Sequence, residues 1–356
     1  MIINKLIYIT KLWLLCFVLP LLANRNIDLE TKAQDFVLNT KKIEIPGHPH
    51  AFNASIVYWR GSLILSFREL PLPNKALACS IQSSSLSRVG LVFLNDDLTL
   101  ASDPYVLDLP GATFEGEILA RSEDARLINV DEHLYIVYSD NSNQIVTEGG
   151  FRMHVGKLDF DGTCFSLTNL EALTDFPGQS LKRREKNWVP FEYKGDLLLV
   201  YSILPHKIFK PRLDGSGKCD FLDSSRTEIS WKWGELRGGT PALRNKDEYL
   251  AFFHSSMNIT TEHSNGQSIP HYFIGAYTFN KDAPFNITSI SPEPIIGKNF
   301  YKGASYAPYW HPVQVVFPCG FVFNEDYIWL AYGRQDHEIW IAKIDKAGLL
   351  ISLSIL

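Results

Sequence analysis

The chain has 356 residues, of which 46% are hydrophobic and 13% aromatic, and its formal net charge is −5. This composition excludes a disordered chain and is sufficient for a large core. A chain without a basic field argues against a nucleic-acid partner. The five cysteines are scattered with no CxxC pair, which argues against zinc ribbons and thioredoxin-like chemistry.

The N-terminus is typical of a targeting segment. Lys5 and Lys11 precede an apolar run, LWLLCFVLPLLA, at 12–23. A run of about a dozen apolar residues fits a secretory signal better than a membrane span, which needs about 20. We therefore expect residues 1–24 to be a signal peptide or a short signal anchor, and the protein to be secreted or exported. We expect any contact of the protein with a membrane to be made only through this segment. Residues 25–44 are a lead-in, with a short helix expected at Glu30–Val37.

Five short apolar strands recur along the rest of the chain, roughly every 50 to 80 residues, and each carries an aromatic residue beside a small or polar one near its end. Turn residues separate alternating apolar runs, as in antiparallel hairpins, and long helical periodicity is nearly absent. Radial repetition of small sheets explains such a pattern. We predict an all-β fold, a five-bladed β-propeller that forms one catalytic domain over 45–356. The repeated strands are LILSFR (63–68), HLYIVYS (133–139), DLLLVYS (196–202), EYLAFFHS (248–255) and YIWLAYG (327–333). The predicted blades cover roughly 45–110, 111–175, 176–235, 236–295 and 296–356.

Polar clusters lie beside these strands, where propeller blades face a central axis. In Glu123-Asp124-Ala125-Arg126, strand alternation places Asp124 and Arg126 on one face. A carboxyl group in a closed pocket can serve as a general acid, although a surface ion pair is the simpler interpretation of these four residues alone. Lys186 and Asn187 are donors suited to an anion or a sugar hydroxyl. Trp188 could stack on a sugar, or could begin an aromatic core strand.

Two later clusters are equally ambiguous when taken singly. His254 ends an apolar strand, a position where a buried core histidine is more common than a ligand. The preceding segment Arg237–Pro241 contains a glycine pair that permits close backbone approach at the centre. Asp336 follows the fifth repeated strand, where it could bind sugar hydroxyls or cap a turn.

In their order along the chain these clusters resemble glycoside hydrolase family 130, the mannoside phosphorylases and related mannosidases. The resemblance covers roughly Leu63 to Asp336. Ser66-Phe67-Arg68 stands where the family has an arginine that closes the first-blade strand. The segment 123–126 is similar to the family's Glu/Tyr-Asp-Pro-Arg motif, with Ala125 in place of the proline. Further similar segments are Lys186–Phe191, Arg237–Pro241, Phe253–Ser255, Tyr272–Gly275, Val315–Gly320 and Ala331–Asp336.

The resemblance implies a five-bladed propeller with its active site on the axis and Asp124 as the general acid. It implies that Lys186, Asn187 and His254 bind inorganic phosphate as a co-substrate. His206 lies near the place of a family arginine that has no clear match here, and it could substitute in that cluster. An oligosaccharide or glycan is the implied substrate, and no metal or other cofactor is required. The implied sugar-binding residues are Arg68, Arg126, Trp188, Tyr272 and Asp336.

The expected reaction is therefore an inverting transfer of a mannosyl group between β-mannosides and phosphate. Two alternatives stay open at this point. One is inverting hydrolysis on the same scaffold, with a carboxylate such as Glu185 activating water. The other is a non-catalytic propeller that binds glycans without changing them.

Overall fold

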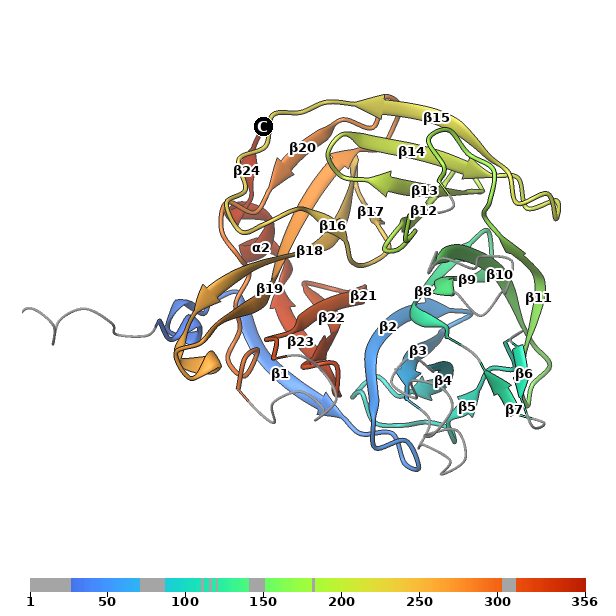
Figure 1. Cartoon of the computed structure of the whole chain (residues 1–356), viewed down its shortest axis with the longest axis horizontal. Coiled ribbons are helices and arrows are strands. Elements are labelled where there is room, and N and C mark those ends of the chain that lie inside the picture. Colours follow the sequence, from blue (N-terminus) through green and yellow to red (C-terminus); the bar gives the residue numbers. More distant parts are fainter. Residues whose placement is uncertain are drawn as a thin grey trace, which may run out of the picture.

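The structure is a computed structural model, and it describes residues 27–70, 87–109, 112–114, 117–119, 121–140, 151–180, 183–302 and 312–356. Five sheets of four or more strands stand in a ring around a central axis (Figure 1). The predicted all-β, five-bladed propeller is confirmed. The expected targeting segment 1–24 lies outside the described residues. Among the described residues, no helix has the length and hydrophobicity needed to cross a bilayer.

Each blade is an antiparallel sheet, and its first strand in sequence lies nearest the axis. In the fifth blade, the outermost strand comes from the start of the chain. Blade 1 comprises β2 (Ala51–Trp59), β3 (Ser62–Glu69), β4 (Arg88–Leu94) and β5 (Tyr105–Val106). Blade 2 comprises β8 (Glu123–Val130), β9 (His133–Asp140), β10 (Arg152–Phe160) and β11 (Phe165–Ala172). A small pair, β6 (Ala112–Phe114) and β7 (Glu117–Leu119), precedes blade 2.

The remaining blades follow the same plan. Blade 3 comprises β12 (Val189–Tyr193), β13 (Asp196–Ser202), β14 (His206–Pro211) and β15 (Cys219–Ser225). Blade 4 comprises β16 (Arg237–Gly238), β17 (Leu243–Asn245), β18 (Glu248–Thr260), β19 (Ser268–Asn280), β20 (Ile287–Ile290) and the C-terminal β24 (Ser354–Ile355). Blade 5 comprises β21 (Val316–Asn324), β22 (Tyr327–Arg334), β23 (Glu338–Asp345) and β1 (Val37–Ile43). The five repeated strands of the sequence are β3, β9, β13, β18 and β22. Each is the second strand from the axis in its blade.

Strand β1 closes the ring. It pairs antiparallel with β23, from Val37 opposite Ile344 to Ile43 opposite Ile339. The edge of β23 would otherwise leave a row of unpaired backbone groups. Residues 37–43 of the expected lead-in therefore belong to the propeller. The expected helix is shorter than predicted, a 3₁₀ turn at Leu29–Lys32 (η2), because Val37 already begins the closing strand. The other short helices are η5 (Glu262–Ser264) and α2 (Lys346–Ser352).

The strand registers place the starts of the inner strands and the ends of the second strands at one end of the ring, which we call the upper end. Ala51 pairs with Glu69 in blade 1, and Glu123 pairs with Ser139 in blade 2. Val316, at the start of β21, pairs with Arg334. The polar residues that close the repeated strands therefore gather around the upper end of the axis.

The same core device occurs in blades 1 and 4, where an aromatic ring of the second strand lies across a glycine of the third. Phe67 pairs with Gly90, and Phe253 pairs with Gly275. A Cβ on either glycine would lie 2.2 Å from the Cζ atom of the facing ring. Both rings are fully buried, so neither can move aside freely.

We expect Gly90→Ala to lower the free energy of unfolding by about 1–3 kcal/mol, because the added methyl overpacks the ring of Phe67. Phe67→Leu in the same chain should recover part of that loss, since the smaller side chain leaves room for the methyl. Denaturant unfolding of both single variants and the double variant measures the coupling. Strictly additive losses would contradict this packing argument.

Candidate active site

A bulge in β2 brings Asn53 to the axis, and its amide joins two carboxylates. Nδ2 of Asn53 donates to Oδ1 of Asp124 at 2.8 Å and to Oδ1 of Asp336 at 3.3 Å. Asn53 has a φ of 48°, a left-handed conformation that asparagine tolerates better than most residues. Behind it, a Cβ on Gly333 would lie 1.8 Å from Oδ1 of Asn53, so this position of β22 requires glycine. The sequence analysis gave Asn53 no role and missed its place in the site.

Asp124 lies where the resemblance implied, at the upper end of the axis. It is 8% exposed and has a φ of 51°, at a bulge between Glu123 and Arg126. Nη1 of Arg68 donates to its Oδ1 at 3.3 Å. Burial opposes ionisation of Asp124, but the charge of Arg68, the Asn53 hydrogen bond and the charge of Arg126 together hold the pKa of the carboxyl below its usual value.

The pKa of Asp336 is shifted in the opposite direction, above its usual value. Burial, followed by the negative charge of Asp124, raises the pKa of Asp336 to about 6, against the counteracting charge of Arg68. The residue follows β22 with a φ of 47° and shares the Asn53 amide with Asp124. Two carboxylates that face one amide cannot both ionise easily, so below about pH 6 the pair carries a proton.

Arg126 connects three blades. Its Nε donates to the carbonyl oxygen of Gly239 at 2.5 Å, and its Nη1 donates to the carbonyl oxygen of Asp124 at 2.8 Å. Its Nη2 donates to Oδ1 of Asn187 at 3.0 Å. Only 1% of the residue is exposed, and its guanidinium lies 5.9 Å from the ring centroid of Phe317. Arg126 thus fixes the backbone of Asp124 and the orientation of the Asn187 amide.

Lys186 reaches the site, where it is already paired. Its ammonium forms an ion pair with Glu123 and lies 3.7 Å from the ring centroid of Phe151. The other carboxylate oxygen of Glu123 lies 3.2 Å from Nη2 of Arg68. Glu123 therefore bridges a residue of the predicted phosphate cluster and a residue of the predicted sugar site. Sequence reasoning treated Glu123 only as part of a motif and assigned it no such role.

His254 is a buried, neutral imidazole at the axis. Its ring stacks on Tyr272, with centroids 5.7 Å apart and planes within 6°, and lies 4.6 Å from the ring of Phe317. Burial, followed by the charges of Arg126 and Arg237, lowers the pKa of His254 to about 3. Its Nδ1 is buried and has no hydrogen-bond partner among the described residues. A buried nitrogen of this kind is available to a ligand.

The structure corrects two expectations. Trp188 is 1% exposed and lies in the core of blade 3, with its ring centroid 5.0 Å from that of Phe176, so it presents no face to a sugar. Trp188 precedes β12, and the left-handed φ of 64° at Asn187 changes the direction of the chain there, so Trp188 enters the core while Lys186 and Asn187 approach the axis. His206 begins β14, the third strand from the axis, and its Nδ1 lies 2.9 Å from the carbonyl oxygen of Phe285.

His206 is 2% exposed, and burial lowers its pKa to about 4. It therefore packs between blades 3 and 4 as a neutral core residue rather than joining the phosphate cluster. The predicted residues that the structure does bring together are Arg68, Asp124, Arg126, Lys186, Asn187, His254, Tyr272 and Asp336. Within the described ranges, no group of three or more histidine, cysteine, aspartate or glutamate side chains is arranged to hold a metal ion.

We expect Asp336→Asn to change the pH dependence of stability. Because the native pKa of about 6 exceeds the usual value of 3.8, native Asp336 keeps its proton while the unfolded chain loses it, and stability falls as pH rises from about 4 to 6. Asparagine removes this loss, so the variant should gain about 1–2 kcal/mol over wild type at pH 7.5 and little at pH 4. Solvent screening reduces the effect because the side chain is partly exposed. Denaturant unfolding at both pH values, with exposed Asp326→Asn as the control, measures it. An equal difference at both values would contradict it.

Comparison with known proteins agrees with this geometry. The family model of glycoside hydrolase family 130, described as beta-1,4-mannooligosaccharide phosphorylase, matches residues 25–352. A 1,2-beta-oligomannan phosphorylase from Thermoanaerobacter sp. (strain X514) is 22% identical over 311 residues, which cover 84% of this chain and 90% of that protein.

Solved structures share the fold. A beta-1,2-mannobiose phosphorylase from Listeria innocua, in complex with beta-1,2-mannobiose, is 17% identical with a TM-score of 0.57, covering 88% of this chain and 99% of that one. A mannose phosphorylase from Leishmania mexicana, in complex with a phosphate ion, is 15% identical with a TM-score of 0.57, covering 92% of this chain and 93% of that one. Because the family model spans nearly the whole propeller and its site, this chain belongs to glycoside hydrolase family 130.

Proposed function

We propose that the protein is an inverting mannoside phosphorylase, which transfers a mannosyl group between β-mannosides and inorganic phosphate. The observation that carries the proposal is the placement of Asp124 on the axis. Arg126 donates both to the carbonyl oxygen of Asp124 and to the side chain of Asn187. The preceding residue, Glu123, forms an ion pair with Lys186. A carboxyl group that can donate a proton and side chains that can donate to an anion are thus held in one network. Family membership and the phosphorylases among its relatives support the same reaction.

In the proposed reaction Asp124 protonates the oxygen of the leaving sugar, directly or through a sugar hydroxyl. Phosphate attacks the anomeric carbon from the opposite face, and the glycosidic C–O bond breaks as the new C–O bond forms. The product is α-mannose 1-phosphate, and the reverse reaction makes β-mannosides. Although Asp124 is ionised in the empty site, a bound sugar deepens the burial that already opposes ionisation, which moves a proton toward this carboxyl.

The nucleophile side is built from donors that the protein has oriented. Because Oδ1 of Asn187 accepts from Arg126, the Nδ2 amide group is left to donate to an anion. Neutral His254 contributes a ring nitrogen that lacks a protein partner within the described chain. Lys186 contributes the charge, in competition with Glu123. Phosphate is therefore the co-substrate that this set of groups fits.

The hydrolytic alternative lacks a comparable observation. Glu185, its suggested base, is 3% exposed and accepts a hydrogen bond from Nε1 of Trp188 at 3.3 Å. Among the described residues, no hydrogen bond joins Glu185 to Asp124 or Asn53. Burial raises the pKa of Glu185. The carboxyl group nevertheless lies on the core side of the turn, beside Trp188, and not at the axis. Nothing in a binding-only propeller would call for two carboxylates sharing one buried amide.

We also propose that the enzyme is exported. The proposal rests on the apolar run at 12–23, which follows Lys5 and Lys11. This segment lies outside the described residues. N-terminal sequencing of the protein recovered from its host tests the proposal, since a start near residue 25 would show cleavage and an intact Met1 would indicate a retained segment.

We expect Asp124→Asn to lower kcat by about 10²–10⁴-fold, because asparagine cannot supply the proton. The backbone should keep its conformation, since asparagine also tolerates the left-handed φ of 51°. Phosphate release from α-mannose 1-phosphate with a panel of mannose-containing acceptors measures the rate, and thermal unfolding checks the fold. Exposed Asp103→Asn is the matched control. Wild-type rates in Asp124→Asn would refute the assignment.

We expect Lys186→Ala to raise KM for phosphate by about tenfold or more, with a much smaller effect on KM for the mannoside, because the ammonium makes a charge-assisted contact to the anion alone. Lys210→Ala is the control, since Lys210 is also ion-paired, with Asp196, but lies on the outer strand β14. Product formation that is indifferent to added phosphate would instead indicate hydrolysis.

A further inference from the structure

The segment before the closing strand, residues 27–36, lies against blade 4 and against the connection from blade 4 to blade 5 (Figure 1). In the turn between β18 and β19, the backbone nitrogen of Glu262 donates to the carbonyl oxygen of Ile27 at 3.1 Å. In the connection, the carbonyl oxygen of Ile296 accepts from the backbone nitrogen of Gln34 at 3.0 Å. The proposed reaction gives this segment no role.

Glu30 is the buried acid of this segment, and its carboxylate organises a turn of the connection between blades 4 and 5. The residue is 8% exposed. Its Oε1 accepts from the backbone nitrogens of Tyr301 at 2.9 Å and Lys302 at 3.1 Å, and its Oε2 accepts from that of Asn299 at 3.0 Å. Asp28 fixes the position of Glu30, because Oδ1 of Asp28 accepts from the backbone nitrogen of Glu30 at 2.9 Å. Three backbone donors on one carboxylate hold the turn firmly.

The turn at 299–302 contacts the active site through Tyr301. The hydroxyl of Tyr301 donates to the carbonyl oxygen of Tyr272 at 2.7 Å. The ring of Tyr272 stacks on His254, whose Nδ1 has no hydrogen-bond partner among the described residues. Tyr301 is 3% exposed, so its ring cannot shift without repacking the core around it. The position of the imidazole assigned to phosphate therefore depends, through two tyrosines, on Glu30.

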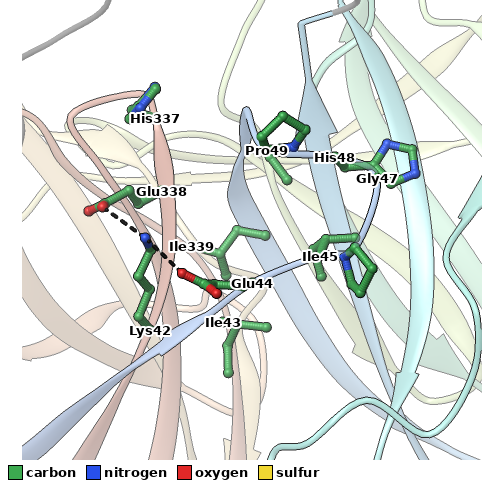
Figure 2. A pocket seen from close by; sticks show the side chains of 12 residues that line it. Lys42, Ile43, Glu44, Ile45, Gly47, His48, Pro49, His337, Glu338 and Ile339 are labelled. Atoms are coloured by element: carbon green, nitrogen blue, oxygen red, sulfur yellow. Dashed lines mark ion pairs between the residues drawn. The ribbon is translucent and has the colours of Figure 1, made fainter.

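The same turn also contacts the sugar side, where it is one support among several. Nη1 of Arg334, two residues before Asp336, donates to the carbonyl oxygen of Asn299 at 2.8 Å. Nε of Arg334 donates to Glu338 at 2.7 Å, and Glu338 is in turn ion-paired with Lys42 of the closing strand at 3.3 Å (Figure 2). The sugar side is thus held independently of the turn, and loss of the turn should affect mainly the phosphate side.

We propose that Glu30 is a positioning residue of the active site, which acts through Tyr301 and Tyr272 to hold His254 in place for phosphate. The inference rests on the proposed function, because it takes inorganic phosphate as the ligand of His254. Glu30 acts on the turn and not on the substrates themselves. Loss of its carboxylate therefore weakens phosphate binding in the folded enzyme, and does not only lower stability.

The test compares Glu30→Gln with Gln34→Ala in the purified full-length enzyme. Gln34 is the matched control, since its side chain joins the same segment to the same connection through two hydrogen bonds, with Pro294 and Ile296, which precede the turn at 299–302. Initial rates of phosphorolysis of a β-linked mannobiose, with phosphate and mannoside varied in turn, give KM for each.

We expect Glu30→Gln to raise KM for phosphate about three- to tenfold, as for the loss of one hydrogen bond, and KM for the mannoside less than twofold. Gln34→Ala should lower the melting temperature and leave both KM values within twofold of wild type. An equal rise of KM for phosphate in Gln34→Ala would overturn the proposal, because it would show a general effect of loosening the segment.

Tyr301→Phe tests the path and decides the question alone if Glu30→Gln fails to fold. It removes the hydroxyl that donates to Tyr272 and keeps the buried ring. We expect a similar rise of KM for phosphate, and in the double variant with Glu30→Gln no further rise, since both changes interrupt one path. Rises that multiply in the double variant, or an unchanged KM for phosphate in folded Tyr301→Phe, would overturn the proposal.

Failure of the proposed function is distinguishable from failure of the positioning role. The proton NMR signals of the His254 ring report its position without any substrate, because the stacked ring of Tyr272 shifts them. They are identified as the signals that His254→Gln lacks. If wild type uses no phosphate, Glu30→Gln and Tyr301→Phe should still move these signals and Gln34→Ala should not. Signals unmoved in Glu30→Gln and Tyr301→Phe would overturn the positioning role, whichever reaction the enzyme catalyses.

Discussion

The buried guanidinium of Arg126 is the interaction on which the site depends. A buried cation is costly unless its donors are satisfied, and those of Arg126 are satisfied from blades 2, 3 and 4 together. The glycines at 238 and 239 follow from this requirement. A Cβ on Gly238 would lie 2.1 Å from the carbonyl oxygen of Asn187, so only glycine lets the two blades approach closely enough to share one arginine.

Around this centre the charges nearly cancel. Arg68, Arg126 and Lys186 face Glu123, Asp124 and Asp336, and His254 stays neutral. The pKa of Asp336, about 6, leaves this carboxyl mainly ionised at neutral pH. A site of this kind does not attract anions by net charge, as a cluster of arginines would. Its affinity for phosphate depends instead on whether the anion can take Lys186 from Glu123. The same ion pair therefore links occupancy of the nucleophile side to Arg68 on the sugar side.

Local patterns predicted the blades well, because each repeated strand is a short apolar run that is buried over most of its length and has the same place in its hairpin. Local patterns could not predict that residues 37–43 close the ring, since this strand pairs with a segment about 300 residues away in the chain. Trp188 and His206 show the second limit. Trp188 directly follows Asn187 in sequence, yet the turn before β12 places it in the core, and the strand order of blade 3 places His206 on the third strand from the axis. Asn53 shows a third, because the bulge that carries it depends on Gly333 of another blade.

The path of the chain explains why residues from several blades meet at one end of the ring. The strand order of the sheets requires each connection between blades to run from an outer strand to the next inner strand, and at the upper end these connections cross from the rim toward the axis. The segment 183–188 leads into β12 and carries Lys186 and Asn187, and the connection at 44–50 leads into β2, which carries Asn53 near its start. The strand that completes the ring is therefore joined by a short connection to the strand that brings Asn53 to the axis, so ring closure and the position of the shared amide depend on one segment of the chain.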